Sequence, residues 1–314
     1  MDRISTAAGY QSALLQILSA QNRQSAAQSQ VSTGKVAQDL QGFGDQADTL
    51  TATRSLKARI DSYLSNATAL SSTLDVQNQG LGQLADAAQS ARGAVAEALA
   101  TGSADGLMTS LQGFLSQAVD ALNTEYQGRR LFAGGQTDTN PVKALSLSDL
   151  TAAPSLAGLF NNDQLPTTNR LDDTVTVQTG FLASDLGQPV FQALQAVEAI
   201  DQGPLGPLKG SLTQAQQAAL QQALPQFDSA WNNVNEAVAQ NGGLQNRVST
   251  VQTALQDRQT ALTGLLSGIT DVDMASAVSK LQLAQTAMQA SAQVFATLQS
   301  SSLLNILGPA TATP

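Results

Sequence analysis

Few residues in this chain could do chemistry, because its sequence contains neither histidine nor cysteine. Histidine is the usual general base near neutral pH and the commonest metal ligand. Cysteine supplies thiolate nucleophiles, thiolate metal sites and disulfides. Catalysis would therefore depend on carboxylates, lysine or tyrosine. We expect a protein that is not an enzyme and that holds neither a metal ion nor a cofactor.

One short segment superficially resembles a phosphate-binding loop. Residues 32–35 read Ser-Thr-Gly-Lys, but the loop also needs an upstream glycine, a preceding strand and a Ser or Thr after the lysine. Here a helical pattern precedes the segment and Val36 follows Lys35. The pattern instead predicts the end of a helix, with Gly34 as the first residue beyond it.

Carboxylates are the other candidates. Asp271 and Asp273 could bind a hard cation, yet no further carboxylate or glycine completes a calcium-type loop. Carboxylates at the start of a helix complement its dipole, and Thr270 or Asp271 is the predicted N-cap. Turn and surface roles are expected for the aspartates of the middle segment, which are Asp149, Asp163, Asp172, Asp173 and Asp185.

The composition excludes several kinds of partner. A net charge of −9 argues against nucleic acid and anionic membranes, which both require clustered Lys and Arg. No apolar run is long enough to span a bilayer. The sequence also lacks the basic start and following apolar segment of a signal peptide, so we do not expect one to be cleaved. Aromatic residues are only 4% of the chain, so its core must consist of Leu, Val and Ala, which suits helix–helix packing.

Heptad spacing predicts long helices. We expect them over residues 6–32, 46–100, 104–126, 186–200 and 213–266, the last bent near Pro225. Residues 268–273 are expected to break the pattern before a final helix. The predicted seam of the first helix is Tyr10, Leu14, Ile17, Gln21, Gln24, Gln28 and Val31. That of the second is Ile60, Leu64, Ala67, Ser71, Leu74, Asn78, Leu81, Ala85, Ala88, Arg92, Val95 and Leu99. Later stripes are Val248, Val251, Leu255, Leu262 and Leu265, and then Met274, Val278, Leu281, Met288, Phe295, Leu298, Leu303 and Leu304.

The two ends of the chain are almost free of charge. Residues 4–34 contain one charged side chain, Arg23, and residues 281–314 contain none. A monomeric helical bundle normally exposes charges on its outer face, whereas these helices have uncharged outer faces. We expect the N- and C-terminal helices to pair, to be buried on all sides in a polymer and to be disordered in the free monomer. The predicted assembly residues are Tyr10, Leu14, Ile17, Val31, Val278, Leu281, Met288, Phe295, Leu298, Leu303 and Leu304.

The middle of the chain differs. Prolines and turn residues replace the heptads, and residues 173–178 alternate as in a strand. The predicted fold is therefore mainly α, an antiparallel helical rod or coiled-coil bundle with a small β-containing insertion facing solvent. The predicted domains are 1–40 with 270–314 (coiled-coil core), 41–140 with 186–269 (rod) and 141–185 (insertion).

Two adjacent glycines, Gly242 and Gly243, interrupt a helical pattern. Glycine destabilises a helix interior. The pair could mark a bend or break, or a place where a neighbouring backbone or subunit comes close. The pattern favours neither alternative.

Several motifs, in order along the chain, resemble the bacterial flagellin superfamily. Residues 31–35 match the Ser-Thr-Gly-Lys that ends the family's first helix, and Asn246-Arg247 matches the Asn-Arg motif of its C-terminal rod helix. Residues 269–274 match its Asp-x-Asp break, and residues 302–307 match its Ser/Leu-rich terminus.

Other stretches are most similar to the hook-associated branch of this superfamily. They are residues 1–6, 128–134 (with Leu131, Phe132 and Gly134), 137–139 and 286–291 with Phe295. Arg92 matches one position of the patch that an innate immune receptor binds in some flagellins, but Ser90 and Gly93 replace the expected neighbours.

The resemblance implies a structural subunit of the bacterial flagellum that joins hook to filament. Implied partners are copies of itself, other hook-associated proteins, hook protein, flagellin and an export chaperone. The implied location is extracellular, after export of the unfolded chain by the flagellar type III apparatus. The alternatives are a flagellin of the bulk filament and, from a different class, a secreted coiled-coil binding protein such as an adhesin or granule-surface protein.

Overall fold

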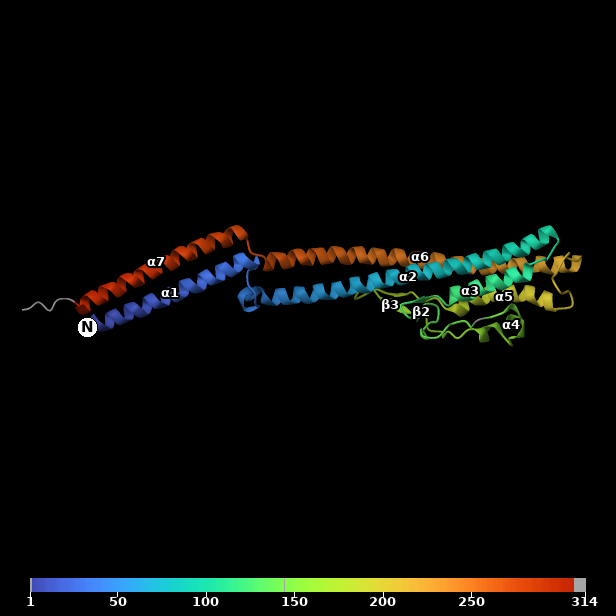
Figure 1. Cartoon of the computed structure of the whole chain (residues 1–314), viewed down its shortest axis with the longest axis horizontal. Coiled ribbons are helices and arrows are strands. Elements are labelled where there is room, and N and C mark those ends of the chain that lie inside the picture. The colour runs from blue at the N-terminus through green and yellow to red at the C-terminus, as the bar shows by residue number, and fades with distance from the viewer. Residues whose placement is uncertain (1, 144, 308–314) are drawn as a thin grey trace, which may run out of the picture. The chain divides into compact units, whose positions relative to one another are not determined.

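The computed structural model describes residues 2–143 and 145–307, and the side chains of residues 11–143 and 145–298. The long helices are α1 (Asp2–Thr33), α2 (Ala47–Thr101), α6 (Gln214–Thr270) and α7 (Met274–Leu307), and the shorter ones are α3 (Leu107–Leu122), α4 (Leu147–Ala152) and α5 (Ala183–Gln202) (Figure 1). Two 3-10 turns, η1 (Gln41–Gln46) and η2 (Leu156–Leu159), and four short strands complete the chain: β1 (Glu125–Tyr126), β2 (Arg129–Arg130), β3 (Thr168–Arg170) and β4 (Thr176–Gln178). The predicted mainly α class is confirmed.

Contacts between residues divide the chain into two compact units. The terminal unit comprises Met1–Arg59 and Arg258–Pro314, and the central unit comprises Ile60–Asp257. The division into three assembly domains stays a prediction. None of the helices in the part of the chain that the structure describes is both long and apolar enough to cross a membrane.

In the terminal unit, α1 and α7 pack antiparallel, with many of their Cα atoms within 8 Å of each other (Figure 1). The seam, meaning the side chains that face the partner helix, is built on alanine. Its buried members are Ala13, Ala20 and Ala27 on α1 and Ala277 and Ala284 on α7. Half-buried residues at heptad spacing lie between them, including Ile17, Gln24 and Val31.

This seam corrects part of the predicted one. Leu14 is 49% exposed, and Gln21 and Gln28 are also exposed, so the predicted seam of α1 is wrong at these three positions. In each case the preceding residue, an alanine, faces α7 instead. Alanine allows the two backbones to approach, whereas leucine at the same place would hold them apart.

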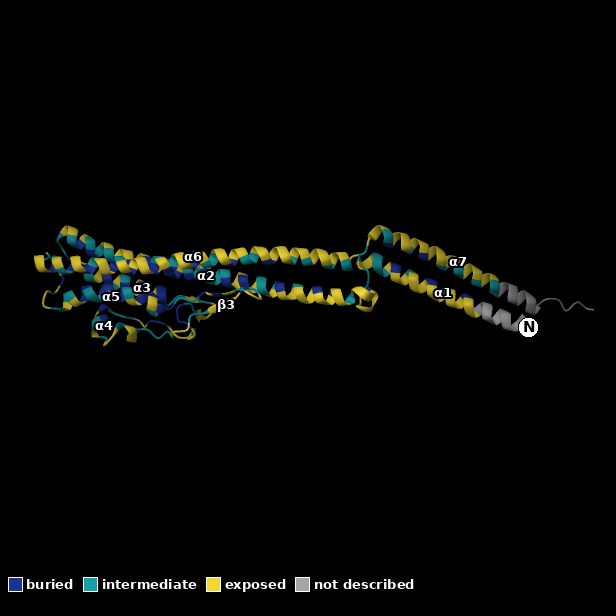
Figure 2. Ribbon diagram, turned by 180° about the vertical axis from the view of Figure 1, so that it is seen from behind, coloured by how far each residue is buried: buried dark blue, intermediate teal, exposed yellow. Residues whose placement is uncertain are grey.

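In the central unit, the predicted seam of α2 is confirmed from Ile60 to Leu99, since each of its members is buried or half-buried. One large apolar cluster lies where α3 and α5 pack beside α2 and α6 (Figure 2). Its largest fully buried side chains are Phe132, Phe191 and Phe227. Phe191 stacks on the half-buried Phe160, with ring centroids 5.2 Å apart.

Helix α6 is continuous through Gly242 and Gly243, so of the alternatives left open by the sequence a helix break is excluded there. A Cβ atom on either glycine would meet no atom within 4 Å, so no other segment in the described part of the chain approaches them closely. The helix also extends past Gly268 to Thr270, and Leu265, a predicted seam residue, is 50% exposed.

The middle segment contains two small hairpins. Strands β1 and β2 pair antiparallel through a turn in which Gln127 and Gly128 have φ of 52° and 77°, as in a type I′ turn. Strand β4, which pairs with β3, is the second half of the strand predicted at 173–178. The segment does not simply face solvent, because it buries Leu147, Leu150, Leu171 and Val177.

Candidate assembly interface

The outer faces of α1 and α7 expose large apolar side chains. On α1, Leu14, Leu15 and Leu18 are 49%, 61% and 48% exposed, and on α7 Leu283 and Val294 are 70% and 53% exposed. The only charged side chains in the described parts of these helices beyond residue 10 are Arg23 and Lys280. Such apolar surface is typical of a contact site.

The predicted assembly residues lie on two different surfaces. Those that are half-buried at seam spacing are Ile17, Val31, Leu281, Met288, Phe295 and Leu298. Leu14 and Val278, which is 40% exposed, lie outside the seam. The side chains of Tyr10, Leu303 and Leu304 lie outside the described residues.

The sequence reasoning missed the outermost residues, Leu15, Leu18, Leu283 and Val294. A signal for them exists in the sequence. Leu14 and Leu15 are adjacent, and neighbouring residues on a helix point about 100° apart, so they cannot face the same partner equally. A shallow hollow of about 370 Å³ lies beside Val294, lined also by Ala290, Gln293, Thr297 and Leu298.

A joint within the terminal unit connects the end of α1 to the start of α7; we define it as residues 34–36 and 270–273. Gly34 adopts a φ of +67° and its N–H donates to Gln30 O at 2.9 Å, which ends α1 as predicted. Val36 N donates to Thr270 O at 2.8 Å, and Val272 N donates to Gly34 O at 3.0 Å. The two linkers therefore pair as in a small antiparallel bridge.

Charge reinforces this joint. The Lys35 ammonium donates to the Asp271 carboxylate, which also accepts hydrogen bonds from the Ser267 and Thr270 hydroxyls. These donors, Lys35 foremost, lower the pKa of Asp271 from 3.8 to about 2. Asp271 is therefore a carboxylate at any pH near neutral.

The N-cap of α7 is Asp273 rather than the predicted Thr270 or Asp271. Asp273 Oδ1 accepts from Ala275 N at 3.0 Å. Thr270 and Asp271 are engaged in the joint, so α7 begins three residues later than a cap at Thr270 would place it. In the described parts of the chain, no group of three or more His, Cys, Asp or Glu residues could hold a metal ion.

The motif residues of 128–134 lie in the central unit and support its fold. Phe132 is 1% exposed in the large cluster, and its carbonyl accepts from Ala183 N at 2.9 Å. Gly134 has a φ of +67°, and a Cβ there would lie 2.2 Å from Asp163 Oδ1. Asp163 accepts from Gly135 N and Leu165 N at 2.9 and 3.0 Å, which lowers its pKa. These residues anchor the middle segment to the core.

The other motif residues lie on the helices. Arg92 of α2 pairs with Asp228 of α6. Asn246 and Arg247 are exposed on α6, and Arg247 lines a groove of about 650 Å³ together with Asp185 and Glu236. Arg92 therefore stabilises the pairing of α2 with α6, whereas Arg247 is accessible to another molecule.

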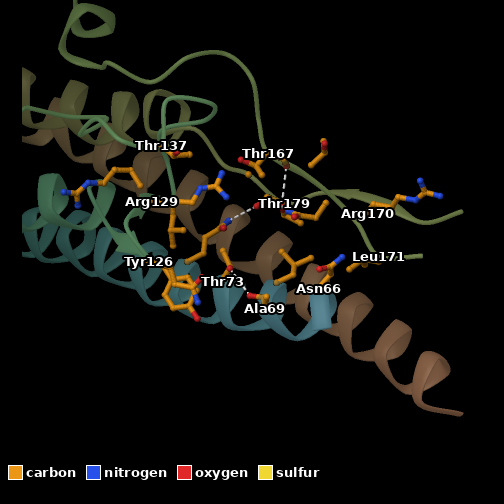
Figure 3. A pocket seen from close by; sticks show the side chains of 18 residues that line it. Asn66, Ala69, Thr73, Tyr126, Arg129, Thr137, Thr167, Arg170, Leu171 and Thr179 are labelled. Carbon is orange, nitrogen blue, oxygen red and sulfur yellow. Dashed lines mark hydrogen bonds between the residues drawn. The ribbon is translucent and has the colours of Figure 1, made fainter. Parts of the chain in front are cut away.

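A second hollow, of about 460 Å³, lies between α2 and the two hairpins (Figure 3). Hydroxyl and amide side chains line much of it, among them Asn66, Thr73, Thr137 and Thr167. Thr179 borders it, and the main chain of Thr179 is hydrogen-bonded on two sides. Its carbonyl oxygen accepts from the Gln77 side chain, and its N–H donates to Thr167 O. No sequence motif predicted this hollow.

Comparison with known proteins places this arrangement in a family. Residues 4–137 match the model of the bacterial flagellin N-terminal helical region, and residues 224–307 match that of the C-terminal helical region. The "Flagellar hook-associated protein 3" of Escherichia coli strain K12 is 25% identical over 207 residues, which span 64% of this chain and 65% of that protein. The match thus spans just under two thirds of the curated relative.

Solved structures share the fold. A structure from Vibrio parahaemolyticus, described as a flagellar hook-associated protein, superposes with a TM-score of 0.59 at 19% identity and covers 72% of this chain and 97% of its own. Hook-associated protein-3 of Legionella pneumophila superposes with a TM-score of 0.55 at 13% identity, over 70% of this chain and 98% of its own. With both helical regions matched and the fold shared, the chain belongs to the bacterial flagellin family.

Proposed function

We propose that this protein is a structural subunit of the bacterial flagellum that joins the hook to the filament. The observation that carries the proposal is the nearly uncharged outer face of α1 and α7, which exposes Leu15 and Leu283 at 61% and 70%. The likeness to the E. coli hook-associated protein 3 supports the junction role over that of a bulk flagellin.

Assembly would bury these outer faces between neighbouring copies. Full burial of one exposed leucine contributes roughly 1.5–3 kcal/mol. Several leucines per subunit would together supply part of the free energy that offsets the entropy lost when two long helices become ordered. The alanine seam sets the pairing of α1 with α7, and the outer leucines supply the contacts with neighbours.

The partners and route that we propose follow from this role. They are copies of the same chain, hook protein and other hook-associated proteins on one side, flagellin on the other, and an export chaperone before assembly. The chain would reach the cell exterior unfolded through the flagellar export apparatus. It would act without enzymatic activity, through its surfaces alone.

Deletion of the gene tests the junction role. We expect cells that keep intact hooks, lack filaments and release flagellin into the medium, with filaments restored by the gene in trans. Hooks that still bear ordinary filaments would contradict the junction role.

Quantification of the protein in purified flagella separates the junction role from the bulk-filament alternative. A junction subunit is expected in about one ring per flagellum, in small proportion to flagellin. If this chain is instead the major protein of the filament, the bulk-flagellin alternative is correct and the junction proposal is wrong.

A further inference from the structure

The apolar core of the central unit is divided in two along α2 and α6. The larger cluster includes Leu81, Phe132 and Phe227, and the smaller one includes Leu74, Leu171 and Val248. Between them lies a set of amide side chains that we call the amide layer: Gln77 and Asn78 of α2, and Asn241 and Gln245 of α6. The boundary between the two apolar clusters is therefore occupied by polar amide side chains.

The amide layer joins three elements by hydrogen bonds. Asn241, fully buried, donates through Nδ2 to Leu74 O at 3.0 Å and to Asn78 Oδ1 at 3.3 Å. Gln245 Nε2 donates to the same Leu74 oxygen at 3.2 Å, so that two side chains of α6 converge on one carbonyl of α2. Gln77, 2% exposed, donates to Thr179 O at 3.0 Å and so connects the β3–β4 hairpin.

Asn241 occupies a position where an apolar residue is expected. Val234 and Val248, seven residues before and after it on α6, are both fully buried. The Oδ1 atom of Asn241 is the one buried side-chain oxygen or nitrogen without a hydrogen-bond partner in the described part of the chain. A buried acceptor without a partner destabilises the folded state. An asparagine with one unpartnered oxygen in the core is therefore not explained by packing alone.

The seam on either side of the amide layer repeats every seven residues. A helix pair with such a repeat can also pair after a shift of seven residues, because apolar residues again meet apolar residues. That shift would place Val234 or Val248 beside Asn78 and would remove the Asn241 amide from the Leu74 oxygen. A single polar residue in an apolar seam is known to select one register at a cost in stability.

We propose that the amide layer, with Asn241 at its centre, fixes the register of α6 on α2 and the position of the β3–β4 hairpin against both. Asn241 is thus a positioning residue that favours one arrangement over its shifted alternatives. This inference concerns the central unit alone and does not depend on the junction role.

Cross-linking tests the proposal directly, because the full chain contains no cysteine. Thr68→Cys with Gln252→Cys reports the native register, since the two side chains meet there, with Thr68 Oγ1 and Gln252 Nε2 3.5 Å apart. Asp61→Cys with Gln252→Cys and Thr68→Cys with Gln259→Cys report shifts of seven residues in the two directions. Each pair is placed in the natural background and in Asn241→Leu. All are treated under the same conditions with a short bifunctional thiol reagent, because the length of the Gln252 side chain leaves the two thiols too far apart to rely on a direct disulfide.

With Asn241 present, we expect only the native cross-link. With Asn241→Leu, we expect the shifted cross-link to appear at the expense of the native one, while the urea midpoint stays the same or rises. Val248→Leu is the matched control, because it changes the same seam one heptad away, and it should leave the native cross-link alone.

Two results would overturn the proposal. One is the native cross-link alone in Asn241→Leu, which would show that the register is fixed elsewhere. The other is a lowered urea midpoint with no shifted cross-link, which would show that Asn241 stabilises the core rather than selects its register. If Asn241→Leu does not fold, as judged by circular dichroism, Asn241→Ala serves the same test with the same two expected results.

Discussion

The terminal and central units are both built on long helices, yet their seams differ. The α1–α7 seam buries alanines, and the two backbones lie close together. The core of the central unit buries leucine, valine and three phenylalanines. Helices α3 and α5 and the hairpins pack against α2 and α6 to form it. The unit with the larger buried side chains is also the one that encloses its apolar core, whereas the terminal pair leaves large apolar side chains exposed.

An alanine seam removes little apolar area from water per residue, whereas each buried leucine or phenylalanine contributes roughly 1.5–3 kcal/mol. We therefore expect the central unit to fold by itself. The terminal pair buries less apolar surface, and several of its large apolar side chains are exposed instead. We expect its stability to come from neighbours.

The largest effect is expected from charge on the outer faces of the terminal pair. Leu15→Glu combined with Leu283→Glu should abolish incorporation at the hook, because two charges would have to be buried between subunits. Sedimentation with hook–filament structures and recovery of motility measure this. Leu165→Glu is the matched control, since Leu165 is also 70% exposed but belongs to the central unit, and it should assemble normally. Normal assembly of the double variant would contradict the account.

The next largest effect is expected in the central core. Phe191→Ala should lower the free energy of unfolding of the free chain by about 3–5 kcal/mol, because it removes a fully buried ring that stacks on Phe160. Urea unfolding followed by the fluorescence of Trp231, the single tryptophan, reports this unit. Val294→Ala on exposed α7 should leave that transition unchanged. Equal losses from both variants would mean that the two units unfold as one.

A smaller effect is expected from a larger residue in the alanine seam. Ala20→Leu should destabilise the α1–α7 pair by about 1–3 kcal/mol, because the close backbones leave no room for leucine. The temperature at which assembled material dissociates measures this loss. Ala26→Leu, at an exposed position of the same helix, should not force the helices apart. An unchanged dissociation temperature for Ala20→Leu would show that the seam is not tightly packed.

The smallest effect is expected at the joint. The folded-state pKa of Asp271 is lowered from 3.8 to about 2. The contribution of its carboxylate to the stability of the folded state is therefore fully present above pH 3.8 and is lost as the pH falls through 2. In assembled material, a solid-state NMR titration of the Asp271 carboxyl carbon should give a midpoint near 2, and Lys35→Met should raise it toward 3.8. A midpoint already at 3.8 in the unaltered chain would show that Lys35 and Asp271 do not pair in the assembled protein.

The sequence predicts the fold well because long heptad patterns determine helices. The seam of α2 and the end of α1 at Gly34 follow from spacing and from one glycine. The seam of α1 does not, because a pattern of leucines favours Leu14 and gives no reason to prefer the neighbouring alanine. Asp271 as the partner of Lys35 depends on a contact between residues 236 positions apart in the sequence. Because that contact engages Asp271, the cap of α7 is Asp273, which the spacing alone did not select.

The register role of Asn241 was not predicted from the sequence, although its place seven residues from both Val234 and Val248 is a signal that it faces the seam. Gly242 and Gly243 show the reverse case. They are conspicuous in the sequence, yet the helix continues through them and no other segment of the described chain packs against them. Only the contacts between distant segments of the chain show that Asn241 is held in the core and that Gly242 and Gly243 are not.

Hydrogen exchange of the full chain, free and assembled at the hook, tests the central claim most directly. The account predicts that the amides of α1 and α7 exchange rapidly in the free chain and become protected on assembly, whereas those of the central unit are protected in both states. Protection of α1 and α7 in the free chain, equal to that of the central unit, would contradict it.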